Sequence, residues 1–260
     1  MTDWDGAEYA QISGLQRAMA SASLESLVLA GTERVLDVGC GDGFVTGEIA
    51  KRLPGGSVLG MDPSPRMIAA AQAIDRGLAN LEFVAGDVTT MTFGPDFDLV
   101  ASFNALHWVH DQQDAYRNIA AALRPDGRVL VQFVCEGERP SIEDVAWEVS
   151  REPRWASAFA DFVRPYEHID PDSLATLAAG ADLQVTALAV RDREWDFGSR
   201  AGFAQWCTVG FADWVSRLSE DELAAFVDEV VDGYEAVVGQ AGLFRFLQLR
   251  AELSRSPAAS

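Results

Sequence analysis

Short apolar segments typical of buried strands alternate with helix-like segments along the first half of the chain. The strand-like segments cover residues 34–39, 57–62, 81–85, 97–103 and 128–134. Helix-like segments lie between most of them, at residues 45–53, 66–76 and 114–123. Alternation of this kind predicts an α/β fold with a parallel, doubly wound sheet. Such sheets bind ligands at the carboxyl ends of their strands, near the point where the strand order reverses.

The segments on either side of this alternation predict further elements of one domain that spans residues 1–260. An N-terminal helical segment is expected over residues 7–30, followed by the core at 31–134. Beyond the core, helices are expected over 142–160, 173–178, 203–218 and 220–238, and strands over 184–191 and 243–253. Aromatic residues concentrate between positions 147 and 214. The segments 136–170 and 195–240 are therefore expected to form a helical cap over an apolar substrate pocket.

The charge of the chain disfavours several classes of partner. The 20 Lys and Arg residues face 40 Asp and Glu residues, which gives a formal net charge of −20. A nucleic-acid-binding protein needs a basic face, so no nucleic-acid partner is expected. The same charge disfavours an anionic membrane surface, and no apolar run approaches the ~18 residues of a membrane span.

The cysteines and the N-terminus indicate the compartment. Cys40, Cys135 and Cys207 are widely spaced and form no C-x-x-C pair, so neither a zinc site nor a disulfide framework is expected. The acidic N-terminus lacks the apolar region of a signal peptide. These features favour the reducing cytoplasm. The sequence gives no indication of the oligomeric state.

Residues 37–43, with the sequence Asp-Val-Gly-Cys-Gly-Asp-Gly, lie where the first strand meets the first core helix. Glycines allow positive φ angles and a close approach of ligand to backbone. The dinucleotide fingerprint G-x-G-x-x-G does not fit, because its third glycine would fall on Phe44 or Thr46. Asp37, two residues before the first glycine, suits an ammonium group better than a pyrophosphate. The loop is therefore predicted to bind a ligand other than a dinucleotide.

This loop resembles motif I of class I methyltransferases that use S-adenosylmethionine, and the resemblance extends over about residues 33–134. It implies a Rossmann-like, seven-stranded sheet and S-adenosylmethionine as the cofactor. Asp62 matches the acidic residue that accepts hydrogen bonds from the ribose hydroxyls, and Asp87 matches the residue that binds the exocyclic amine of adenine. The residues implied to bind the cofactor are Asp37, Gly39, Gly41, Gly43, Asp62, Pro63, Met67, Asp87, Val88 and Asn104.

Two further sequence runs resemble the carboxyl methyltransferases of juvenile-hormone acid and farnesoic acid. These are residues 9–17 and the Leu106-His107-Trp108 run after the fourth strand. In those enzymes, and in the plant salicylate-type enzymes, a Gln and a Trp hold the substrate carboxylate, and the matching positions are Gln16 and Trp108. Both side chains are neutral donors. Neutral donors orient a carboxylate without over-stabilising a charge that disappears in the transition state. The resemblance thus implies a small-molecule acceptor, namely a lipophilic carboxylic acid.

Alternatives remain open from the sequence. A phenol or a carbon acceptor would need a base, and His107 and His110 lie near the end of the fourth strand. A weaker resemblance to trans-aconitate methyltransferases suggests a polyacid, although a polyacid would need several arginines in an otherwise aromatic cap. A protein that binds S-adenosylmethionine without catalysis is the alternative outside the enzymes.

Overall fold

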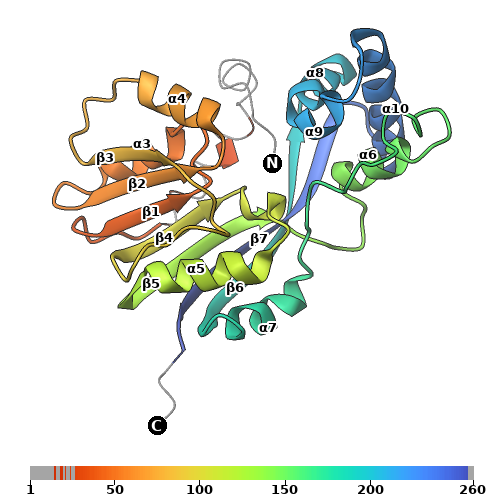
Figure 1. Ribbon diagram of the computed structural model, residues 1–260. Coiled ribbons are helices and arrows are strands. Elements are labelled where there is room, and N and C mark those ends of the chain that lie inside the picture. The colour runs from red at the N-terminus through yellow and green to blue at the C-terminus, as the bar shows by residue number, and fades with distance from the viewer. Residues whose placement is uncertain (1–14, 16–17, 20, 22–23, 25–26, 257–260) are drawn as a thin grey trace.

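The computed structural model describes residues 15, 18–19, 21, 24 and 27–256. Seven strands form one sheet in the order β3-β2-β1-β4-β5-β7-β6 (Figure 1). The strands are β1 Arg34–Val38, β2 Ser57–Asp62, β3 Leu81–Ala85, β4 Phe97–Phe103, β5 Leu123–Val134, β6 Leu183–Asp196 and β7 Leu243–Arg255. The helices are α3 Phe44–Lys51, α4 Pro65–Ala73, η1 Leu106–Trp108, α5 Gln112–Ala122, α6 Ile142–Ser150, η2 Pro171–Ser173, α7 Leu174–Ala179, α8 Arg200–Gly210, α9 Ala212–Val215 and α10 Glu220–Val238.

The sheet is parallel from β3 through β5, as the alternating sequence pattern predicts. Strand β7 runs antiparallel to both of its neighbours, β5 and β6. The strand order reverses between β1 and β4, since the chain passes from β1 outward to β3 and then returns. A ligand crevice is therefore expected at the carboxyl ends of β1 and β4. The predicted Rossmann-like, doubly wound sheet with seven strands is confirmed.

Successive residues of the central strands point to opposite faces of the sheet. Leu36 packs into the apolar core beneath α5 and α7, whereas Val35 packs with α3 and with Leu24 and Leu27 of the N-terminal segment. Both faces are therefore covered, which explains why the parallel strands read as nearly continuous apolar runs.

A helical cap lies beyond one end of the sheet, as the clustered aromatics predict. Helices α6, α8, α9 and α10 form it, beside the far ends of β6 and β7 (Figure 1). These two strands continue past the sheet as a two-stranded ribbon, with Asp192 to Asp196 paired to Leu247 to Leu243. The aromatic residues of the cap pack in a cluster of their own, separate from the two clusters that flank the sheet.

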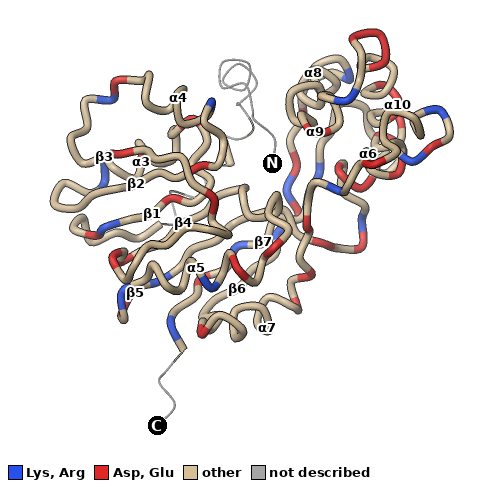
Figure 2. Tube along the Cα trace, in the orientation of Figure 1, with Lys and Arg blue, Asp and Glu red and all other residues tan. Residues whose placement is uncertain are grey.

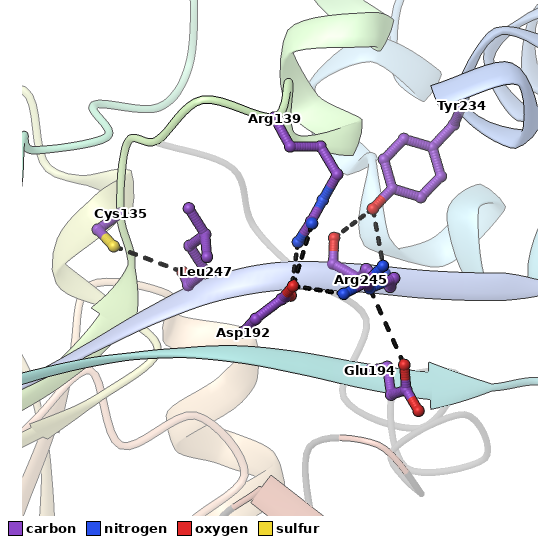
Figure 3. Close-up of polar contacts among 7 residues, drawn as sticks. All are labelled: Cys135, Arg139, Asp192, Glu194, Tyr234, Arg245 and Leu247. Carbon is purple, nitrogen blue, oxygen red and sulfur yellow. Dashed lines mark hydrogen bonds and ion pairs between the residues drawn. The ribbon is translucent and has the colours of Figure 1, made fainter. Parts of the chain in front are cut away.

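Polar contacts fix the cap to this ribbon (Figure 3). Asp192 on β6 accepts from Arg139, which precedes α6, at 2.6 Å and from Arg245 on β7 at 2.5 Å. Tyr234 on α10 donates from its hydroxyl to the carbonyl of Arg245 and accepts from the Arg245 amide at 3.1 Å. Because these residues come from α10, from both ribbon strands and from the segment leading into α6, the cap holds a defined position over the sheet.

Several predicted boundaries are wrong. The helix expected over 7–30 ends earlier, because residues 27–30 are irregular and lead into Gly31 with a φ of 95°. The helix expected over 142–160 ends at Ser150, three residues before Pro153, which cannot continue a helix. The helix expected over 203–218 is broken at Phe211, whose φ of −103° and ψ of 40° are not helical. Strand β6 runs to Asp196 instead of residue 191, because the ribbon extends beyond the sheet.

Within the described part of the chain, no helix is both long and apolar enough to cross a membrane. The same residues contain no cluster of three metal-ligating side chains. Cys40, Cys135 and Cys207 are buried free thiols, as their spacing suggests.

Candidate active site

A cavity of about 260 Å³ opens at the carboxyl ends of β1, β2 and β4 and continues beneath the cap. Its sheet half is lined by Asp37, Gly39, Cys40, Gly41, Asp42, Asp62, Pro63, Met67, Gly86, Asp87, Val88 and Asn104. Its cap half is lined by Leu15, Met19, Leu106, His107, Trp108, Val134, Glu143, Trp206, Gly210, Phe244 and Phe246. The crevice therefore lies at the strand-order reversal, where the sequence pattern places it.

The glycine loop forms the floor of the sheet half. Gly39 and Gly41 have φ angles of 75° and 54°, in the left-handed region that favours glycine. A Cβ atom on Gly39 would lie 2.1 Å from the Cβ of Ala105, so the loop after β1 touches the loop after β4. A Cβ atom on Gly41 would meet no atom within 4 Å, so the backbone there faces open space. The loop thus exposes its backbone to a ligand.

Gly43 is the exception among the residues predicted to bind the cofactor, because it does not line the cavity. Its φ of 74° caps the start of α3, and a Cβ atom there would lie 2.4 Å from the ring of Phe83. The third glycine therefore allows the close packing of α3 against β3.

Asp62 joins the glycine loop to the end of β2. Its Oδ2 atom accepts from the amide of Gly41 at 2.9 Å, and its Oδ1 atom accepts from the amide of Ser64 at 2.9 Å. Burial raises the pKa of this carboxyl, and the two amides act in the opposite direction. Each carboxylate oxygen has two lone pairs, so Asp62 retains capacity to accept further hydrogen bonds from a ligand.

Asp37 is a second buried acid in the same half of the cavity. Its residue is 1% exposed, and its Oδ2 atom accepts from the Thr46 hydroxyl at 2.7 Å. Burial raises the pKa of Asp37 to about 6, with a further contribution from the charge of Asp62. Two carboxyl groups held this close to an open backbone loop favour a ligand that brings hydrogen-bond donors or a positive charge.

The loops after β3 and β4 complete the sheet half. Asp87 accepts from the amide and the hydroxyl of Thr89, both at 2.8 Å, which fixes the turn that presents Val88. Asn104 has a φ of 55°, and its buried Oδ1 atom has no partner among the described residues. A strained backbone and an unsatisfied amide oxygen beside a cavity are typical of a ligand contact. Pro63 and Met67 add apolar surface to the same wall.

His107 and Trp108 lie on η1, where the sheet half meets the cap half. Burial, with a contribution from the charge of His168, lowers the pKa of His107 well below its ordinary value. The ring is therefore neutral at neutral pH, and its low proton affinity weakens it as a general base. His110 is exposed and does not line the cavity. Gln16 lies outside the described residues, although its neighbour Leu15 lines the cap half.

Local sequence patterns do not reveal several residues of the cap half. His168 lies in a stretch without a motif, yet it is half-buried and its ring lies 6.0 Å from that of His107. Phe244 and Phe246 line the cavity from the ribbon strand β7, and Glu143 lines it from α6. Each lies far from the sheet motifs along the chain, and no local pattern marks it. Besides the Leu106-His107-Trp108 run, the sequence indicates this half by its concentration of aromatic residues, to which Trp206 belongs.

Comparisons with known proteins agree with this architecture. A family described as "Methyltransferase domain" matches residues 35–127, which hold the glycine loop and the next three strands. The chain is a class I methyltransferase that uses S-adenosylmethionine.

Relatives of this methyltransferase include a trans-aconitate 2-methyltransferase of Methylobacterium nodulans. It is 29% identical over 245 residues, which cover 93% of this chain and 91% of the relative. Among solved structures, the YcgJ protein of Bacillus subtilis has a TM-score of 0.64 at 16% identity and covers 93% of this chain and 100% of its own. A Haemonchus contortus phosphoethanolamine N-methyltransferase, solved with S-adenosyl-L-methionine, has a TM-score of 0.59 at 18% identity, over 96% of this chain and 57% of its own. The two structural likenesses concern the fold.

Proposed function

We propose that this methyltransferase acts on the carboxylate of a lipophilic acid and forms a methyl ester. The observation that carries the proposal is the composition of the cap half of the cavity. Apolar and aromatic side chains dominate it, and no lysine or arginine is found among the described residues that line the cavity. An apolar chamber suits a lipophilic tail, whereas an acceptor with several charges would need cations there.

The sheet half is proposed to hold the cofactor. Asp37 would face its ammonium group, and Asp62 would accept from its ribose hydroxyls. Asp87 and the backbone of Val88 would take the adenine amine and ring, beside the apolar side chains of Pro63 and Met67. The unsatisfied Oδ1 of Asn104, the open backbone at Gly41 and the two buried acids support this fit.

The chemistry explains why neutral side chains suffice in the cap half. When bound, S-adenosylmethionine supplies a methyl group on a cationic sulfur, and a carboxylate oxygen attacking in line takes the methyl group as the carbon–sulfur bond breaks. A carboxylate is already ionised at neutral pH, so no base is required. Trp108 lines the junction of the two halves and carries a neutral N–H donor. Together with Gln16, it is proposed to orient the acceptor while the surrounding apolar walls exclude water.

The relatives support a carboxylate but leave the rest of the acceptor open. The name of the Methylobacterium nodulans relative gives trans-aconitate as its acceptor, and trans-aconitate carries carboxylates. A polyacid is disfavoured here by the absence of cationic lining residues among the described ones and by the net charge of −20. Lysines and arginines are scattered among acidic residues in Figure 2, which also disfavours a nucleic-acid acceptor. The three buried free thiols favour a cytoplasmic setting.

The decisive experiment measures methyl transfer from labelled S-adenosylmethionine. Acceptors would be fatty, isoprenoid and aromatic acids, trans-aconitate, and matching phenols and amines. Each labelled product would then be treated with mild alkali. Alkali-labile label on a lipophilic acid is the expected result. If trans-aconitate alone is labelled, the proposed acceptor is wrong and a polyacid takes the place of the lipophilic acid. Alkali-stable label on a phenol would reject the carboxylate and make His107 the base to test.

Trp108→Phe keeps an aromatic ring but removes the indole N–H. We expect kcat/KM for the acid to fall about 10- to 100-fold, because an oriented hydrogen bond to a charged acceptor is lost. The affinity for S-adenosylmethionine, measured by calorimetry, should stay within about twofold. Trp147→Phe is the matched control, since Trp147 packs on Phe162 outside the cavity. A loss of cofactor affinity in Trp108→Phe would contradict the proposed role.

Cofactor binding is expected to depend on pH through Asp37. Its pKa of about 6 in the free protein means that the carboxyl is largely protonated at pH 5. An ammonium group favours the ionised form, so a proton must leave on binding, and affinity should fall up to about tenfold per pH unit below 6. Calorimetric titration between pH 5 and 7.5 measures this slope. Asp37→Asn should bind more weakly at pH 7.5 and show a shallower slope, whereas an unchanged slope would assign the proton to another group.

A further inference from the structure

Glu143 is a buried acid in the cap half that the proposed reaction does not use. It lies in the first turn of α6, where Ser141 and Asp144 form a reciprocal capping box without it. The residue is 5% exposed and lines the cavity. The capping box is therefore complete without the Glu143 carboxyl, and little of this residue faces solvent.

Among the described residues, no positive charge acts on the pKa of Glu143. Burial raises the pKa of Glu143 to about 7, against hydrogen bonds from its own amide and from Ser141, and the charge of Asp144 raises it further. None of the groups that act on this pKa is a cation. Burying an acid in this way lowers stability, and proteins retain such groups where function requires them.

A neutral donor also lines this cavity. Trp206 on α8 is 7% exposed and lines the cavity, and its Nε1 atom has no partner among the described residues. Helices α6 and α8 both pack on α10, and the charge of Glu143 acts on the thiol of Cys207, the residue after Trp206. Phe244 and Phe246, which line the cavity from β7, are apolar.

A negatively charged Glu143 would repel the carboxylate that is methylated, so it must face another part of the acceptor. We propose that Glu143 accepts a hydrogen bond from a hydroxyl or ammonium group of the acceptor, remote from the methylated carboxylate. This inference rests on the proposed function and narrows it. The acceptor is then a lipophilic acid with a second polar group. The indole N–H of Trp206, which lines the same cavity, is a further donor that a hydroxyl oxygen of the acceptor could use.

The test compares Glu143→Leu and Glu143→Gln on matched acceptors. These are straight-chain acids of equal length, either unsubstituted or carrying a hydroxyl or an amine at successive positions. For the best substituted acid, Glu143→Leu should lower kcat/KM about 30-fold or more, because a site built for a polar group loses its partner. For unsubstituted acids, kcat/KM of the same variant should equal or exceed that of the natural chain. Glu143→Gln should keep kcat/KM for the hydroxyl-substituted acids within about threefold. It should lose activity on the amine-substituted acids, because an amide accepts a hydrogen bond but lacks the charge.

Controls separate this inference from the fold and from the proposed function. Glu148→Leu, at an exposed position of the same helix, should change no preference. Glu143→Leu should unfold at a higher temperature than the natural chain, since a buried acid is removed. Calorimetry with the protein loaded with S-adenosylhomocysteine measures acceptor binding without methyl transfer.

Each outcome then supports or overturns one statement. If acids are methylated but Glu143→Leu treats substituted and unsubstituted acids alike, the inference fails and the proposed function stands. If substituted acids bind in a Glu143-dependent way but no acid is methylated, the proposed function fails and the Glu143 site stands. A preference that changes equally in Glu148→Leu would also overturn the assignment.

Discussion

Gly39→Ala is expected to damage both stability and catalysis, because the new methyl group has no room. Its Cβ would lie 2.1 Å from that of Ala105, against the 3.5–4.0 Å of an ordinary carbon contact. Overpacking costs roughly 1–3 kcal/mol and a left-handed φ roughly 1–2 kcal/mol, so unfolding free energy should fall by about 2–5 kcal/mol. The new methyl group would push apart the loops that hold Gly39 and Ala105. Because both loops line the cavity, kcat/KM should fall about 100-fold or more.

Two variants show whether the collision or the backbone angle is responsible. Gly77 has a φ of 62°, and a Cβ atom added there would meet no atom within 4 Å, so Gly77→Ala adds backbone strain alone. It should cost about 1–2 kcal/mol and leave the Kd of S-adenosylmethionine unchanged. Ala105→Gly added to Gly39→Ala removes the opposing methyl group and should restore part of the activity. Urea unfolding and calorimetry measure these effects, and equal behaviour of Gly39→Ala and Gly77→Ala would refute the collision.

Asp62→Ala should weaken the binding of S-adenosylmethionine by roughly 1.5–3 kcal/mol, which is about 10- to 150-fold in Kd. Two contributions are lost together. The carboxylate no longer accepts the proposed ribose hydrogen bonds, and the amides of Gly41 and Ser64 lose their acceptor. Calorimetry with the natural chain and the variant measures the change.

The two contributions can be separated with a modified ligand. The natural chain should bind S-adenosylhomocysteine more tightly than its 2′-deoxy analogue, whereas Asp62→Ala should bind both equally. Asp75→Ala is the matched control, because Asp75 accepts from the amide of Gly77 in a similar turn outside the cavity. If Asp62→Ala still distinguishes the two ligands, the ribose contact belongs to another residue.

The lining of the sheet half could be predicted because short local motifs mark its residues. Strand patterns, the glycine loop and an acid at the end of β2 each occupy a few consecutive residues, and parallel topology brings the strand ends together. The packing of Gly43 against Phe83 could not be predicted, because the sequence does not show which glycine lines a cavity and which one lies against a neighbouring strand. That choice depends on how closely α3 packs against β3.

The cap half could not be predicted in the same way, because distant segments build it. Glu143 on α6, Trp206 on α8 and Phe244 on β7 meet through tertiary packing alone. Their local sequences are typical of the first turn of a helix, of a helix rich in aromatic residues and of a strand. Such patterns occur in the cores of many proteins and do not mark a binding site. The sequence around His168 is typical of a linker. The place of its ring beside Tyr166, at 4.6 Å between ring centroids, and near His107 results from tertiary packing, which a local pattern does not show.

The ribbon formed by the far ends of β6 and β7 connects the helical cap to the sheet. Its pairs from Asp192 to Asp196 hold the cap without using any residue of the glycine loop. Mutations can therefore accumulate in α6, α8 and α10 and alter the shape of the acceptor chamber while the methyl-donor half stays intact. A chimaera joined within the ribbon would therefore exchange the acceptor chamber and keep the methyl-donor half.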